Sequence, residues 1–123
     1  MDGLDYLGLI NKRTHLKEFI DAISSVDLGC LVSRSELAGV AMVEFLRVGV
    51  PILGTRVGGA TDILTGGGGV LVEPDVDSEQ LAAEIASLYR DRSKYDLLKR
   101  ESEARRNWAS WKRVAAQLDS ILP

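Results

Sequence analysis

Residues 28–48 read LGCLVSRSELAGVAMVEFLRV, and they give the clearest indication of the fold. The stretch begins with the apolar run 28–32, continues through a polar turn, 33–39, and ends in the nearly all-apolar segment 40–48. The run 28–32 does not alternate between apolar and polar residues, which is typical of a strand that helices cover on both faces. The stretch therefore predicts a strand, a turn and a short helix of a parallel α/β sheet.

Further strands and helices are predicted before and after this stretch of the sequence. Strand-length apolar runs occur at 6–10, 50–54 and 70–72. Apolar residues at i, i+3, i+4 and i+7 predict a helix over 16–23, and later helices are expected from Asp77, at about 94–106 and over 108–122. The predicted fold class is α/β, with a Rossmann-like parallel sheet of about four strands and flanking helices.

Local capping signals accompany two of these helices. Thr14 is a plausible N-cap for the helix that begins near Leu16. Asp77, with Gln80 three residues later, resembles a capping box in which each side chain bonds to the backbone of the other residue.

The overall composition excludes several classes of protein. The chain has 123 residues and a net charge of −3, which argues against general nucleic-acid binding. No run of about 18 apolar residues is present, so no transmembrane helix is expected and we predict a cytoplasmic protein. The single histidine, His15, has no cysteine or histidine near it, and no metal site is expected.

Glu44 lies within the segment 40–48, in which seven of the nine residues are apolar. A helix that is apolar nearly all round is expected to be buried, and an unpaired carboxylate there would cost several kcal/mol. Two partners can satisfy it. One is Arg47, three residues later on the same helix, and the other is a set of hydroxyl groups from a bound ligand.

The turn 33–39 favours a bound ligand over Arg47 as the partner of Glu44. It follows a predicted strand, and ligands of open α/β sheets bind in the crevice at the carboxyl ends of the strands. Gly39 would allow a ligand to approach the backbone closely. The first amides of the following helix have no intrahelical acceptor, which suits a phosphate.

The spacing from Glu36 to Glu44 resembles the Glu-(seven residues)-Glu signature of the retaining GT-B glycosyltransferases of group 1. Three more motifs of that family follow in the same order. They are Gly-x-Pro-Val, seen here as 49–52; a paired-glycine loop with an acid, seen as Gly58, Gly59 and Asp62; and Gly-x-Leu-Val, seen as 69–72.

The resemblance implies a role for each residue of the signature. Glu36 would lie beside the hydroxyls of the donor sugar as the catalytic-site residue, and Glu44 would hold the ribose hydroxyls of the nucleotide. The backbone at Ala38, Gly39 and Val40 would face the sugar and the diphosphate. Further crevice residues would be Arg34, Gly58 and Gly59. The family needs no bound metal and no cofactor other than its nucleotide-diphosphate sugar.

The resemblance also implies that residues 1–123 are a single partial donor-binding domain. The parent enzyme would transfer a hexose to an acceptor with retention of configuration. The family's diphosphate-binding Arg and Lys, and the N-terminal acceptor domain, are expected outside this stretch, so the isolated chain is expected to be inactive. The amphipathic helix at 108–122 would pack on that acceptor domain or, without it, form a homodimer. Peripheral membrane contact of the parent enzyme is left open.

Other classes of protein stay open as alternatives. A non-catalytic α/β binding or regulatory module would have a similar size and acidity, although receiver domains usually carry an acidic cluster after the first strand, where this chain has Asn11, Lys12 and Arg13. A truncated paralogue with a scaffold role is a further alternative, as are an epimerase and a phosphorylase of the same fold.

Overall fold

The computed structural model describes residues 3–122, and a parallel sheet lies at its centre. Three strands pair in the order β1 (Gly29–Leu31), β2 (Ile52–Thr55), β3 (Gly69–Val72). Ile52 lies opposite Gly29 on one side and opposite Gly69 on the other. All four residues of β2 are buried, because β2 is the middle strand and is covered on both faces. The predicted α/β class and parallel sheet are confirmed.

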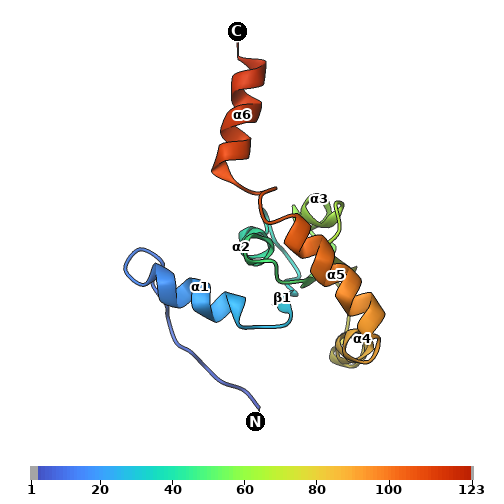
Figure 1. Cartoon of the computed structure of the whole chain (residues 1–123). Helices are drawn as coiled ribbons and strands as arrows, with labels where there is room; N and C mark the ends of the chain where they lie inside the picture. The colour runs from blue at the N-terminus through green and yellow to red at the C-terminus, as the bar shows by residue number, and fades with distance from the viewer. Residues whose placement is uncertain (1–2, 123) are drawn as a thin grey trace.

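The fourth predicted strand, 6–10, is not formed. The segment has no strand hydrogen bonds and is exposed up to Leu9. It leads to α1 along the outside of the molecule, apart from the sheet (Figure 1). A strand needs a neighbour for its backbone amides and carbonyls, and no other strand of the described part lies beside it.

Six helices surround the sheet in residues 3–122. They are α1 (Leu16–Ser24), α2 (Val40–Val48), α3 (Ala60–Leu64), α4 (Ser78–Arg90), α5 (Arg92–Ala104) and α6 (Trp111–Ile121). Five were predicted, and α3 was not, because five residues are too few to show a helical period.

The two capping predictions have different outcomes. The capping box of α4 is confirmed, since the backbone N–H of Gln80 donates to Asp77 Oδ1 at 2.7 Å and Asp77 N donates to Gln80 Oε1 at 3.1 Å. The prediction for α1 is wrong. His15 occupies the N-cap position without a side-chain cap bond, and the Thr14 hydroxyl lies 2.7 Å from His15 Nδ1 instead.

The hydrophobic core lies between α2, the sheet and α3. Met42 and Leu46 of α2 are the only residues of that helix that are buried, and they pack with Ile52 and Ile63. The expectation that α2 is buried all round is therefore wrong. Its residues four apart, Met42 and Leu46, form the buried stripe, and the rest of the helix is partly or fully exposed.

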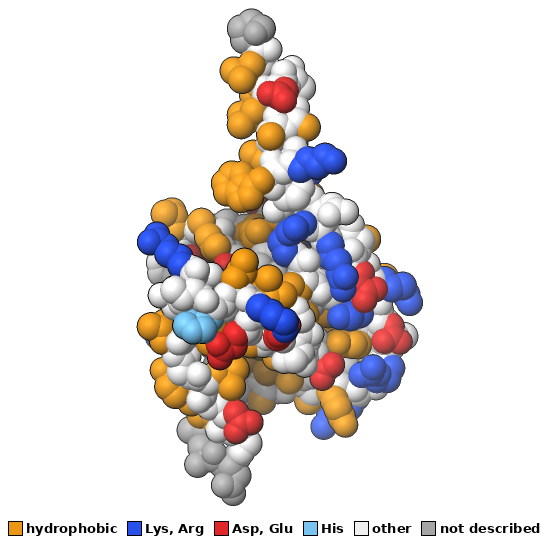
Figure 2. Space-filling model, turned by 60° about the vertical axis from the view of Figure 1, so that its left-hand side comes forward, with side chains coloured by type: hydrophobic (Ala, Val, Ile, Leu, Met, Phe, Trp, Pro, Cys, Tyr) orange, Lys and Arg blue, Asp and Glu red, His pale blue; other side chains and the backbone are white. Residues whose placement is uncertain are grey.

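The last helix, α6, projects from the body of the molecule (Figure 1). None of its residues is buried, and Figure 2 shows apolar side chains along it. The predicted stripe over 108–122 is interrupted. Trp108 lies in the turn before α6, packs on the core and stacks 4.4 Å from the Arg105 guanidinium, whereas Trp111 is 87% exposed. Within residues 3–122, no helix combines the length and hydropathy needed to cross a membrane.

Candidate functional site

The turn after β1 carries Glu36 directly in front of α2. Glu36 Oε1 accepts the backbone N–H of Leu37 at 3.1 Å and that of Gly39 at 3.3 Å. The carboxylate is thus folded back on its own loop, at the positive end of the α2 dipole, where a negative charge is stabilised. The loop of Glu36 is ordered by its own side chain.

Two loops pack back to back at the carboxyl ends of β1 and β2. Gly59 N donates to Leu37 O at 3.0 Å. Gly58 has φ +51°, and a Cβ added there would lie 1.8 Å from the backbone oxygen of Glu36. A Cβ at Gly59 would lie 3.2 Å from the oxygen of Ala38. Gly58 and Gly59 therefore set the position of the 36–38 backbone.

Gly39 and Val40 mark the start of α2. Gly39 is the N-cap and is buried, and a Cβ there would lie 2.9 Å from Ile63 Cδ1. Ala38 is exposed, and Val40 is 59% exposed. The Met42 N–H in the first turn already donates to Gly39 O at 2.9 Å, so the amides of Val40 and Ala41 are the ones that need acceptors from outside the helix. Arg34 is also exposed on this loop.

Glu44 lies on the face of α2 that faces α1. Its side chain is 27% exposed, and Oε1 forms an ion pair with Lys12 Nζ. The local pair with Arg47 is not formed, because Arg47 Nη1 donates to the backbone oxygen of Arg106. Glu44 is thus neither buried in the core nor paired with a residue of its own helix. Its partner comes from the turn before α1.

A cleft of about 660 Å³ lies beside this pair, between α1, α2 and the start of α6. Glu44 is the one predicted site residue among those that line it. The other lining residues are Lys12, Leu16, Phe19, Ile20, Ile23, Arg47, Val48, Ala109, Ser110 and Trp111. The wall is apolar, with charged groups at Lys12, Glu44 and Arg47. An apolar wall with a few polar groups is typical of small-molecule binding sites.

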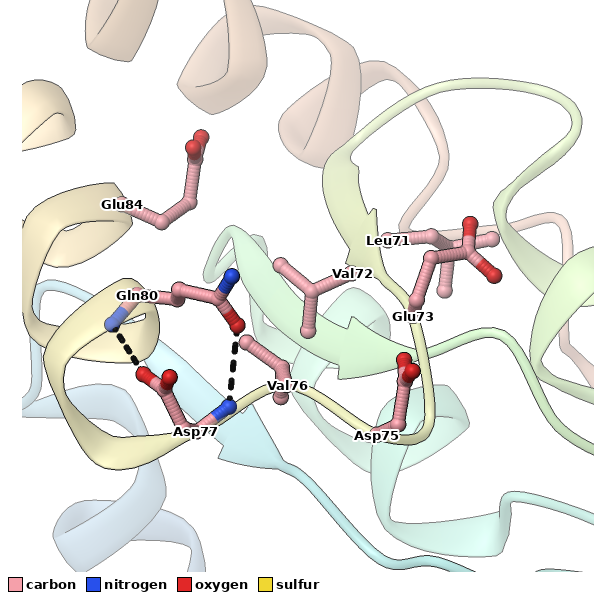
Figure 3. Close-up of a pocket in the computed structure, with 8 residues that line it drawn as sticks. All are labelled: Leu71, Val72, Glu73, Asp75, Val76, Asp77, Gln80 and Glu84. Carbon is pink, nitrogen blue, oxygen red and sulfur yellow. Dashed lines mark hydrogen bonds between the residues drawn. The ribbon is translucent and has the colours of Figure 1, made fainter.

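A second cavity, of about 580 Å³, lies between the end of β3 and the start of α4 (Figure 3). Sequence reasoning did not find it, and none of the predicted site residues lines it. Three of its four acids have partners: Asp77 accepts from Gln80 N at 2.7 Å, Glu73 from Arg56 Nε at 2.9 Å and Glu84 from Lys94 Nζ at 2.8 Å. No cluster of three metal-ligating side chains occurs in the described range.

The family of the chain follows from comparison of its sequence with protein-family models. The model described as glycosyl transferases group 1 matches residues 2–108, which include the strands, the two loops and Glu44. The chain belongs to this family. The resemblance predicted from the four motifs is thereby confirmed. No curated protein matches the chain.

Solved structures share the fold of this group 1 chain. Sucrose-phosphate synthase from Thermosynechococcus elongatus matches with a TM-score of 0.75 and 23% identity, over 98% of this chain and 29% of that one. HepE from Anabaena, in complex with UDP and glucose, matches with a TM-score of 0.72 and 23% identity, over 98% of this chain and 33% of that one. A HepE structure in complex with UDP-glucose matches with a TM-score of 0.66 and 20% identity, over 92% of this chain and 39% of that one. The chain thus spans well under half the length of these proteins.

Proposed function

We propose that this chain is the nucleotide-sugar-binding part of a retaining group 1 hexosyltransferase, with a UDP-linked hexose as the donor. The observation that carries the proposal is the position of Glu44, the second acid of the family signature, whose carboxylate meets an open cleft. The donor class is supported by HepE, whose structures contain UDP, UDP and glucose, or UDP-glucose.

The proposed division of roles follows the chemistry of each group. Glu44 Oε1 is paired with Lys12, and Oε2 has no partner among residues 3–122, so the carboxylate has acceptor capacity for two ribose hydroxyls. Hydrogen bonds to a charged group contribute about 1.5–3 kcal/mol each. The amides of Val40 and Ala41, at the start of α2, would meet the diphosphate, and Glu36 would lie beside the sugar.

The transfer itself would depend on the whole enzyme. Catalysis would rest on orienting the donor and stabilising the leaving diphosphate, without a metal or a cofactor. The acceptor would bind to a further domain, against which α6 would pack. We expect the isolated chain to show no hexosyl transfer and to bind the donor with a Kd in about the millimolar range, which corresponds to roughly −4 kcal/mol. We propose the cytoplasm as its location.

Titration of the ¹⁵N-labelled chain with UDP and UDP-glucose, followed by NMR, tests the proposal. We expect amide shifts in residues 36–44 and around the cleft. Glu44→Gln keeps the shape of the side chain but removes its charge, and it should weaken binding by about tenfold or more. Glu79→Gln, an exposed change in the first turn of α4, is the matched control.

Three results would contradict the proposal. Equal UDP affinity of the wild type and Glu44→Gln would remove Glu44 from the site. Detectable hexosyl transfer by the isolated chain would overturn its expected inactivity. A wild type that shows no shifts with either nucleotide would leave the non-catalytic module or scaffold alternatives.

A further inference from the structure

We propose that Lys12 is a positioning residue of the donor site, which holds Glu44 in place for the ribose and offsets its negative charge. The inference rests on the proposed function, because it concerns the same carboxylate. Lys12 lies in the turn before α1, 32 residues from Glu44. Neither the signature nor helical spacing links the two residues.

The turn that carries Lys12 is ordered by its backbone. Asn11 O accepts the N–H of Thr14 at 3.1 Å and that of His15 at 2.7 Å, and the Arg13 N–H donates to Asn11 Oδ1 at 3.0 Å. Lys12 at its centre points to α2, where its ammonium pairs with Glu44. The main chain that carries Lys12 is therefore held by a structured turn.

A second contact holds the Lys12 ammonium. Nζ lies 4.6 Å from the centre of the Phe19 ring, so the cation is attracted by the ring as well as by the carboxylate. An ion pair in open solvent is worth little, and Lys17–Asp21 on α1, with side chains 89% and 61% exposed, is an example. The side chains of Lys12 and Glu44 are 48% and 27% exposed, and Phe19 covers one side of the pair.

The pair has a consequence for a ligand that carries a diphosphate. A bare carboxylate at this position would repel the phosphates, whereas the Lys12–Glu44 pair is neutral overall. Each carboxylate oxygen accepts more than one hydrogen bond, so hydroxyl groups can bind Glu44 while Lys12 stays in place. Arg47 also lines the cleft, but its guanidinium donates to Arg106 O. Lys12 is thus the cation in contact with Glu44.

Four variants test this role in the chain as it stands. Lys12→Met keeps an unbranched side chain and removes the charge with its contacts to Glu44 and Phe19, Lys12→Arg keeps the charge, and Lys17→Met is the matched control at the exposed pair. The Lys12 ammonium should give an NMR signal slowed in solvent exchange in the wild type, and Glu44→Gln should abolish that signal. The affinity for UDP should fall by about three- to tenfold in Lys12→Met, stay unchanged in Lys17→Met and recover in Lys12→Arg.

The outcomes separate this inference from the proposed function. If Lys12→Met binds UDP as tightly as the wild type, or more tightly, Lys12 does not position Glu44 or competes with the ribose, and the inference is overturned while the donor site stands. If the ammonium signal persists in Glu44→Gln, the pair is not formed and the inference is likewise overturned. A wild type that binds no UDP overturns both proposals.

Discussion

Replacing Gly58 by alanine should destabilise the protein far more than an ordinary glycine substitution. Gly58 has φ +51°, and a non-glycine residue in this left-handed region costs about 1–2 kcal/mol. In addition, the new Cβ would lie 1.8 Å from Glu36 O, a backbone atom that cannot rotate away. The two loops must therefore separate, with an overpacking cost of about 1–3 kcal/mol. Separation also breaks the Gly59–Leu37 hydrogen bond, worth about 1 kcal/mol.

Gly49→Ala is the control that isolates the backbone cost. Gly49 ends α2 with φ +74°, and its added Cβ would meet the Arg106 side chain, the flexible end of which can move. We expect a loss of about 1–2 kcal/mol for Gly49→Ala and about 3–6 kcal/mol for Gly58→Ala in urea unfolding, followed by tryptophan fluorescence. Equal losses for the two variants would refute the reasoning, because the loop contact would then contribute nothing.

Three further predictions concern the core, a cap and the effect of pH. Leu46→Ala, at a side chain with 0% exposure, should lower the free energy of unfolding by about 2–5 kcal/mol, and a loss below that of Asp77→Ala would count against the described core. Asp77→Ala should cost about 1 kcal/mol in urea unfolding, because it removes the acceptor for the Gln80 amide; an unchanged midpoint would show that the box is not formed. Burial, and then the charge of Asp27, raise the pKa of Tyr95, whose hydroxyl donates to Asp27 O at 3.0 Å. Since the pKa of Tyr95 is higher in the folded than in the unfolded state, its stabilisation is complete below the unfolded pKa and is lost as pH rises through the folded pKa. The difference in unfolding free energy between the wild type and Tyr95→Phe should therefore shrink above about pH 10. A difference that stays constant with pH would contradict this prediction.

A strand could be predicted from the sequence where its burial on both faces produces an unbroken run of apolar residues. The run at 50–54 is apolar on both faces because β2 lies between β1 and β3, and the sequence pattern reports this directly. The same pattern at 6–10 predicted a strand that does not form. Pairing requires a neighbouring strand, and a single apolar run contains no information on whether one lies beside it.

The site residues show the same limit. The sequence identified Glu44 as a carboxylate that needs a partner, and the nearest candidate in the chain was Arg47. The structure supplies Lys12 instead, because the turn before α1 is brought against α2. Helical spacing predicts only partners three or four residues away, so an ion pair across 32 residues lies beyond its reach.

Because Gly58 and Gly59 contact the backbone of residues 36–38, the main-chain conformation of this loop does not depend on the side chains that it exposes. The main chain packs against the two glycines, whereas the Leu37 side chain is 89% exposed and that of Ala38 is also exposed. A library randomised at positions 37 and 38 should therefore retain a folded scaffold and vary only what the loop presents outward.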